Sequence, residues 1–240
     1  MEDRIPALPH GLPTPRRPLL GLTLLLVEDS RFACEAMRLM CLRSGARLRR
    51  ADCLSSARRH LQVYRPSGII VDIGLPDGSG LDLIEELSAA RPRIGVILGL
   101  SGEDHALERA MEAGADGCLA KPLESLAKFQ QTVLASLPPD RQPHGPRPVQ
   151  EQPIIPDTAA YREDIAHVAD LLEDGREGPV LDYVAQFLKG VAQSARDTPL
   201  ADAARDLARS RRDGQPGDDT AVLARLEALV QERVGNRAAI

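Results

Sequence analysis

Short apolar runs alternate with stretches of helical periodicity through the first half of the chain. The pattern predicts five strands, at residues 22–27, 46–51, 68–71, 94–100 and 117–120. It predicts five helices that follow them: one that begins after Ser30, and then 55–64, 81–90, 104–113 and 123–137. Strands that alternate with helices indicate a parallel sheet with right-handed crossovers, and strands that are apolar almost throughout indicate burial on both faces.

Two proline-rich segments divide the chain. Residues 1–18 are expected to form a disordered lead, and they contain no apolar core of the kind that a signal peptide needs. Residues 138–156 cannot form a regular helix and are expected to be a linker. An α/β domain is therefore predicted at residues 19–137 and an all-helical bundle at residues 157–240. The helices of the bundle are expected at 158–174, 178–194, 198–212 and 218–234.

The composition narrows the classes of function. Aromatic residues make up 2% of the 240 residues and the net charge is −5, which argues against binding to nucleic-acid bases or phosphates. No apolar stretch reaches the length of a membrane span, so we expect no membrane insertion. The four cysteines form no CxxC pair, and we expect them to be buried apolar residues of a cytoplasmic protein: Cys34, Cys41, Cys53 and Cys118.

Polar side chains stand at the carboxyl ends of four predicted strands. Glu28 and Asp29 follow the first strand, Asp72 the third, Ser101 the fourth and Lys121 the fifth. The carboxyl ends of parallel strands share one edge of a sheet, so we expect these groups to converge. Three carboxylates in one cavity repel each other unless a cation is present, and oxygen ligands with room for water suit Mg²⁺. A lysine and a hydroxyl group beside them suit an incoming anion. The set therefore predicts phosphoryl transfer to an aspartate.

Four segments that carry these residues resemble the receiver domain of two-component response regulators. They are LLLVEDS, IIVDIGLPDGSGLDLI, VILGLSG and GADGCLAKPL, and the resemblance extends over about residues 20–137. It implies a five-stranded doubly wound sheet of flavodoxin-like topology. It also implies that Asp72 accepts a phosphoryl group from a phosphohistidine on a sensor histidine kinase or a histidine-phosphotransfer protein.

The same resemblance implies a role for each neighbour of Asp72. Glu28 and Asp29 would hold Mg²⁺ together with Asp72 and the backbone carbonyl of Gly74. Ser101 and Lys121 would bind the phosphoryl oxygens. A cis peptide bond would precede the proline that follows Lys121.

Two positions depart from the usual receiver pattern. Cys118 stands in the fifth strand, where receivers usually carry Tyr or Phe as a rotamer switch, so the signal is expected to leave the site by another route. Gly102 follows Ser101, and with Gly74 it leaves the phosphoryl site open, which favours fast hydrolysis.

The C-terminal region carries more acidic than basic residues and no helix-turn-helix pattern, which argues against DNA binding. It shows no glycine-rich phosphate loop and no metal cluster, so we expect a regulator that is not an enzyme. Residues 185–192 and 200–207 resemble the signature of histidine-phosphotransfer domains. Gln186 occupies the place of the phosphoacceptor histidine, while Lys189 and Gly190 of the signature remain. A generic amphipathic helix explains the segment as well, and His167 is expected to be an ordinary residue.

Three hypotheses of function follow. The leading one is a response regulator that signals through protein–protein contacts of its helical domain with a downstream partner. The second is a phosphate sink that drains a phosphorelay, with a pseudo-phosphotransfer domain as tether. The third is phosphorylation-dependent dimerisation through a helical stripe at Leu223, Leu226, Leu229 and Val230, although the domain's own core explains the stripe equally.

Overall fold

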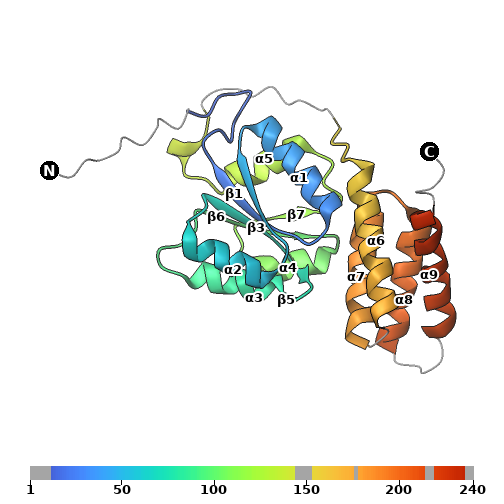
Figure 1. Ribbon diagram of the computed structural model, residues 1–240. Helices are drawn as coiled ribbons and strands as arrows, with labels where there is room; N and C mark the ends of the chain where they lie inside the picture. The colour runs from blue at the N-terminus through green and yellow to red at the C-terminus, as the bar shows by residue number, and fades with distance from the viewer. Residues whose placement is uncertain (1–11, 144–152, 176–177, 214–218, 236–240) are drawn as a thin grey trace.

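The structure is a computed structural model that describes residues 12–143, 153–175, 178–213 and 219–235 (Figure 1). Its first part alternates strands and helices: β1 Thr23–Val27, α1 Arg31–Ser44, β2 Arg47–Ala51, α2 Leu54–Val63, β3 Gly68–Asp72, β4 Gly74–Leu75, β5 Gly78–Ser79, α3 Gly80–Ala89, β6 Val96–Ser101, α4 Asp104–Glu112, β7 Gly117–Ala120 and α5 Leu126–Ala135. A short 3₁₀ helix, η1, follows at Pro139–Arg141. Four long helices complete the chain: α6 Thr158–Asp174, α7 Gly178–Ser194, α8 Thr198–Asp213 and α9 Asp219–Gly235.

The main sheet has the predicted doubly wound topology. Its five strands lie in the order β2-β1-β3-β6-β7, and all of their pairings are parallel. The strand order reverses between β1 and β3, and in sheets of this kind ligands bind outside the carboxyl ends of the strands at such a point. The fold class predicted from the sequence is therefore confirmed for this part of the chain.

The alternation of side chains along β1 explains how both faces of the sheet are covered. Leu24 and Leu26 point into a core that includes residues of α1 and α5. Leu25 and Val27 point to the opposite face, into a core that includes residues of α2, α3 and α4. Figure 1 shows the two groups of helices on opposite faces of the sheet.

Serine caps set the start of several helices. Ser30 accepts a hydrogen bond from the backbone N–H of Ala33 at the start of α1. At α5 the prediction of residues 123–137 is too long, because Ser125 caps the helix by accepting a bond from Lys128 N–H, and the helix runs from Leu126 to Ala135. The turn expected after Asp72 contains a short antiparallel pair, β4 and β5.

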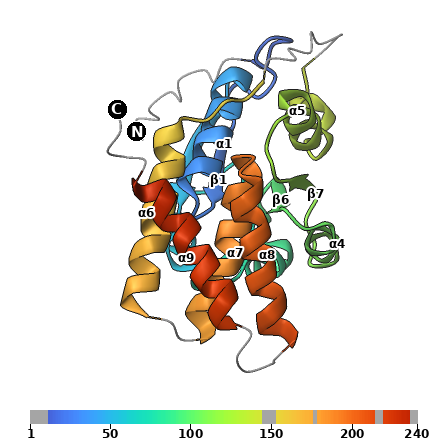
Figure 2. The ribbon, with the colours of Figure 1, turned by 90° about the vertical axis from the view of Figure 1, so that its right-hand side faces the viewer.

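The last four helices form an antiparallel bundle with a core of its own (Figure 2). Each helix packs on the next along the chain, and α9 closes the bundle against α6. Leu223, Leu226 and Val230 are buried in this core and Leu229 packs against it. The stripe that was a candidate for dimerisation therefore packs inside the core of its own bundle.

The flanking segments pack on the sheet domain where they are described. Of the predicted lead, residues 1–11 lie outside the described part, and Thr14 and Arg17 pair through their backbones in a tight turn. Residues 144–152 of the predicted linker also lie outside it, but Ile154 is buried in the core beneath α1 and α5. Cys34 and Cys41 are buried as expected, whereas Cys53 and Cys118 are only half-buried. No helix in the described ranges combines the length and apolar character needed to cross a membrane.

Gly80 offers a test of how tightly α3 is seated against the strand that carries Asp72. A Cβ atom at this position would lie 1.9 Å from the backbone oxygen of Asp72, so the backbone must move. We expect Gly80→Ala to lower the free energy of unfolding by about 1–3 kcal/mol, the usual cost of overpacking. Urea denaturation followed by circular dichroism measures this.

Gly190→Ala is the matched control, because its Cβ would meet no atom within 4 Å and the position lies inside a helix. It should stabilise the protein by about 0.5–1 kcal/mol. Equal effects of the two substitutions would contradict the tight contact at Gly80.

Candidate functional site

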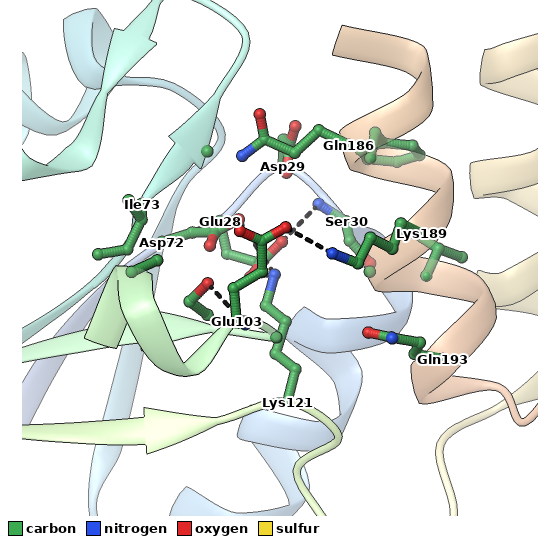
Figure 3. Close-up of a pocket in the computed structure, with 17 residues that line it drawn as sticks. Glu28, Asp29, Ser30, Asp72, Ile73, Glu103, Lys121, Gln186, Lys189 and Gln193 are labelled. Atoms are coloured by element: carbon green, nitrogen blue, oxygen red, sulfur yellow. Dashed lines mark hydrogen bonds and ion pairs between the residues drawn. The ribbon is translucent and has the colours of Figure 1, made fainter. Parts of the chain in front are cut away.

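The acidic residues predicted at the strand ends meet at the switch point of the sheet. Glu28 and Asp29 follow β1, and Asp72 ends the neighbouring strand β3. Carboxylate oxygens of the three residues all lie within 4.8 Å of one another. Glu28 and Asp72 are buried, while Asp29 is half-buried. Figure 3 shows these side chains at one end of the sheet.

Lys121 connects two of the carboxylates from the far side of the pocket. It follows β7, and its Nζ lies 2.7 Å from Oε2 of Glu28 and 3.0 Å from Oδ2 of Asp72. Its side chain is 8% exposed, so these ion pairs are almost fully removed from water. Lys121 also begins a cis peptide bond to Pro122, as the resemblance implied.

Burial dominates the electrostatics of the pocket. It raises the pKa of Glu28 to about 7 and that of Asp72 to about 7, although the Lys121 ammonium group acts in the opposite direction. Burial and the charge of Asp72 raise the pKa of Asp29 to about 6. Burial acts to lower the pKa of Lys121, but Asp72 and Glu28 outweigh it and raise this pKa. The pocket therefore holds more negative charge than Lys121 balances when all three carboxyls are ionised.

Ser101 and Gly74 complete the predicted set. Ser101 ends β6 and lines the pocket, and its hydroxyl oxygen accepts a hydrogen bond from the backbone N–H of Glu103 at 3.2 Å. Gly74 lines the pocket as well, and a hydrogen bond from its backbone N–H to Asp72 favours the ionised form of that carboxylate. All six residues predicted for the site thus lie together, and the roles assigned to them stay predictions.

The donor set fits Mg²⁺. Its oxygens are hard ligands, they come from three separate carboxylates, and the cavity of about 70 Å³ leaves room for water. A divalent cation here would also balance the negative charge of the ionised carboxylates that Lys121 leaves unbalanced. Glu28, Asp29 and Asp72 are the residues that would hold it.

One face of α7 covers the pocket, and sequence analysis missed most of it. Tyr183 donates a hydrogen bond from its hydroxyl to Oδ2 of Asp29 at 2.7 Å. Lys189 Nζ lies 2.5 Å from Oε1 of Glu103. Gln186 and Gln193 also line the pocket, and Figure 3 shows Gln186, Lys189 and Gln193 on the side of α7 next to it. The spacing of these four residues places them on a single helical face, which is the signal that could have identified them.

The two glutamines fill the space that was expected to be open. A Cβ at Gly74 would lie 1.6 Å from Nε2 of Gln186, and a Cβ at Gly102 would lie 3.0 Å from Oε1 of Gln193. The glycines therefore accommodate side chains of α7. Gly190 is not needed for a close approach, because a Cβ there would meet nothing within 4 Å.

A second contact joins the bundle to the sheet domain at the start of α1. Asp164 of α6 is 2% exposed and accepts hydrogen bonds from Ser30 Oγ at 2.7 Å, Arg31 N at 2.8 Å and Phe32 N at 3.1 Å. The carboxylate satisfies N–H groups that a helix start leaves unpaired and meets the positive end of the helix dipole. Edge-to-face packing of Phe32 on Tyr161 extends this contact.

Two other residues discussed from the sequence lie outside the pocket. Cys118 donates a hydrogen bond from Sγ to the backbone oxygen of Leu107, which ties β7 to α4. His167 packs edge-to-face on Phe187, and their ring centroids are 6.0 Å apart. Both contacts are structural.

Comparison with known proteins identifies the sheet domain. Residues 24–133 match the family model described as the response regulator receiver domain. The chain is 32% identical to the KDP operon transcriptional regulatory protein KdpE of Escherichia coli over 98 residues, which cover 41% of this chain and 44% of that protein. It is 26% identical to KdpE of Mycobacterium tuberculosis over 156 residues, 64% of this chain and 65% of that protein.

Solved structures match the same part of the chain. A response regulator from Chloroflexus aurantiacus is 30% identical, with 48% of this chain and 98% of that chain covered and a TM-score of 0.44. The receiver domain of a sensor histidine kinase from Pseudomonas aeruginosa, with a magnesium ion in its active-site cleft, is 26% identical, with 47% and 93% covered and a TM-score of 0.42. The match to the Escherichia coli relative spans less than half of that relative's length.

The raised carboxyl pKa values make a prediction about Mg²⁺. Glu28 and Asp72, with pKa values of about 7, and Asp29, with a pKa of about 6, are ionised at about pH 8 and largely protonated at about pH 5. Because the metal requires ionised ligands, its affinity should fall by about tenfold or more as the pH falls through this window. Isothermal titration calorimetry at the two pH values measures it.

Asp29→Asn serves as the comparison. It replaces one negatively charged carboxylate ligand by a neutral amide, so it should weaken the binding of Mg²⁺ at both pH values. Equal affinity of the unsubstituted protein at the two pH values would contradict a site built from these three carboxylates.

Proposed function

Residues 24–133 form a response regulator receiver domain of two-component signalling, and from this premise we propose that Asp72 accepts a phosphoryl group from a phosphohistidine of a partner protein. The observation that carries the proposal is the convergence of Glu28, Asp29 and Asp72 beside Lys121. The partner is a sensor histidine kinase or a histidine-phosphotransfer protein.

The transfer requires an ionised carboxylate at Asp72. One Asp72 oxygen attacks the phosphorus atom, a P–O bond forms, the P–N bond of the phosphohistidine breaks, and the imidazole leaves with the electron pair of that bond. The Lys121 ammonium group lies 3.0 Å from Oδ2 of Asp72, where it favours the ionised carboxylate and can bind a phosphoryl oxygen. The Ser101 hydroxyl, at the end of the neighbouring strand β6, supplies a hydrogen bond to another phosphoryl oxygen.

Mg²⁺ bound by Glu28, Asp29, Asp72 and the Gly74 carbonyl would supply positive charge to the transferring oxygens. Asp29 is half-buried, whereas Glu28 and Asp72 are buried. Ser30 N–H donates a hydrogen bond to Oε1 of Glu28 at 3.0 Å and holds that carboxylate in place.

The output is proposed to pass through the helical bundle by contact with another protein. The curated relatives are named transcriptional regulators, but the bundle here is acidic overall and packs four helices around a closed core. It contacts the sheet domain at the start of α1 and at the rim of the Asp72 pocket, and the second contact is proposed to couple it to the state of Asp72. The regulator is therefore proposed to act on a protein and not on DNA, and to have no enzymatic activity beyond transfer to and loss from Asp72.

Asp72→Asn tests the proposal, because a carboxamide cannot accept the phosphoryl group. Incubation with Mg²⁺ and the small phosphodonor phosphoramidate should add the mass of one phosphoryl group to the unsubstituted protein and none to this variant, as intact-protein mass spectrometry would show.

Asp77→Asn is the control from the same loop. Asp77 accepts hydrogen bonds from Leu54 N and Ser55 N at the start of α2, outside the pocket, and an asparagine can keep the cap. Labelling that persists in Asp72→Asn would sink the assignment of the acceptor.

A further inference from the structure

The contacts of α7 with the sheet domain reach a ring of residues around the entrance to Asp72. Tyr183 contacts Asp29, and Lys189 contacts Glu103. Gln186 abuts Gly74, and Gln193 abuts Gly102. These four receiver positions come from three different loops at the carboxyl edge of the sheet, after β1, β3 and β6. A single helical face therefore contacts all three loops, and Figure 3 shows its members Gln186, Lys189 and Gln193 beside the pocket.

This cover limits access to the acceptor. The cavity that remains beneath α7 has a volume of about 70 Å³, and Asp72 is 7% exposed. A phosphodonor must bring its phosphorus within about 3–3.5 Å of the attacking oxygen in a defined line. A protein donor must also rest on the residues that ring the entrance, and these residues already contact α7.

The α7 side chain that abuts the loop after Asp72 has no chemistry for the transfer. This residue is Gln186, which contacts the loop at Gly74, and its carboxamide neither accepts nor donates a phosphoryl group. The space beside Gly74 at the entrance to Asp72 is therefore filled by a group that cannot react. The bundle can separate from the sheet domain without unfolding, because its apolar core is separate from the two cores of the sheet domain.

We propose that helices α6 and α7 form an internal competitor for the docking surface of the phosphohistidine donor, so that the docked bundle and phosphorylated Asp72 exclude each other. The occupant of this surface in the released state is the donor protein. The proposal rests on the proposed function of Asp72, since it concerns access to that residue. Binding linkage then requires the reverse effect: a phosphoryl group on Asp72 must weaken docking by the same factor by which docking hinders phosphorylation.

Gln186→Glu is the sharpest variant of the full chain. It preserves the size of the side chain and places a fifth carboxylate in a pocket that is already lined by Glu28, Asp29, Asp72 and Glu103. Asp164→Arg attacks the second contact, because it removes three hydrogen bonds and sets a cation against the positive end of α1. Gln231→Glu is the matched control on α9, which packs on α6 and α8.

Docking is read by amide hydrogen exchange of Arg31 and Phe32, whose N–H groups donate to Asp164 in the docked form. Phosphorylation is read as the rate of labelling by phosphoramidate with Mg²⁺. Exchange should be faster in Gln186→Glu, and labelling should be faster by about tenfold in both Gln186→Glu and Asp164→Arg, in proportion to the released fraction. Gln231→Glu should match the unsubstituted protein in both. Mg²⁺ with beryllofluoride, a phosphoryl analogue, should speed the same amide exchange in the unsubstituted protein and not in Asp72→Asn.

The outcomes separate the two proposals. Release without faster labelling would overturn the competition while leaving Asp72 as acceptor, and so would beryllofluoride binding that leaves the exchange of Arg31 and Phe32 unchanged. Unchanged amide exchange in Gln186→Glu, together with labelling of Asp164→Arg at the rate of the unsubstituted protein, would overturn the assigned interface. No labelling in any variant, released or docked, would instead refute the proposed function.

Discussion

Charge balance at the carboxyl edge of the sheet is the constraint on which the rest of the structure depends. Glu28, Asp29 and Asp72 lie within 4.8 Å of one another, and Lys121 offsets only part of their charge. Burial raises the pKa values of these carboxyls to about 6 or 7. Near neutral pH, small changes around the pocket therefore change how many of the carboxyls are ionised. Any group that brings positive charge or hydrogen-bond donors to this edge is stabilised there.

A divalent cation and the helical bundle meet this requirement in different ways. The cation would neutralise the carboxylates directly. The bundle brings a donor, the Tyr183 hydroxyl, to the Asp29 oxygen, and it brings Lys189 to Glu103 at the rim. Both partners would use Asp29, so occupation of the pocket by metal and phosphoryl oxygens would change the contacts that α7 can make. In the function proposed here, the same charge imbalance underlies both phosphoryl transfer to Asp72 and the coupling of Asp72 to the bundle.

The site could be predicted from the sequence, whereas its cover could not. Asp72 and Ser101 end neighbouring strands of the main sheet and Lys121 directly follows the next strand, and parallel topology alone brings such positions to one edge. Asp164 and Tyr183 find their partners more than 130 residues away in the chain. A polar helical face is the ordinary consequence of exposure to water, so periodicity cannot show that it faces another domain. The start of α5 was predicted wrongly for a local reason. The apolar pattern begins at Leu123, but Ser125 caps the helix, which therefore begins at Leu126.

The strength of the docking contacts suits a reversible cover. The ion pairs of Arg31 with Glu163 and of Arg196 with Glu124 are exposed, and such pairs contribute about 0–1 kcal/mol each. The Asp164 bonds to the start of α1 are buried, and side-chain hydrogen bonds to a helix start are worth about 0.5–2 kcal/mol. Because the bundle is tethered to the sheet domain, a weak interface is enough to keep it docked. An equilibrium that rests on a few kcal/mol can be reversed by one covalent event at Asp72, whereas a large apolar interface would hold the cover in place whatever the state of the acceptor.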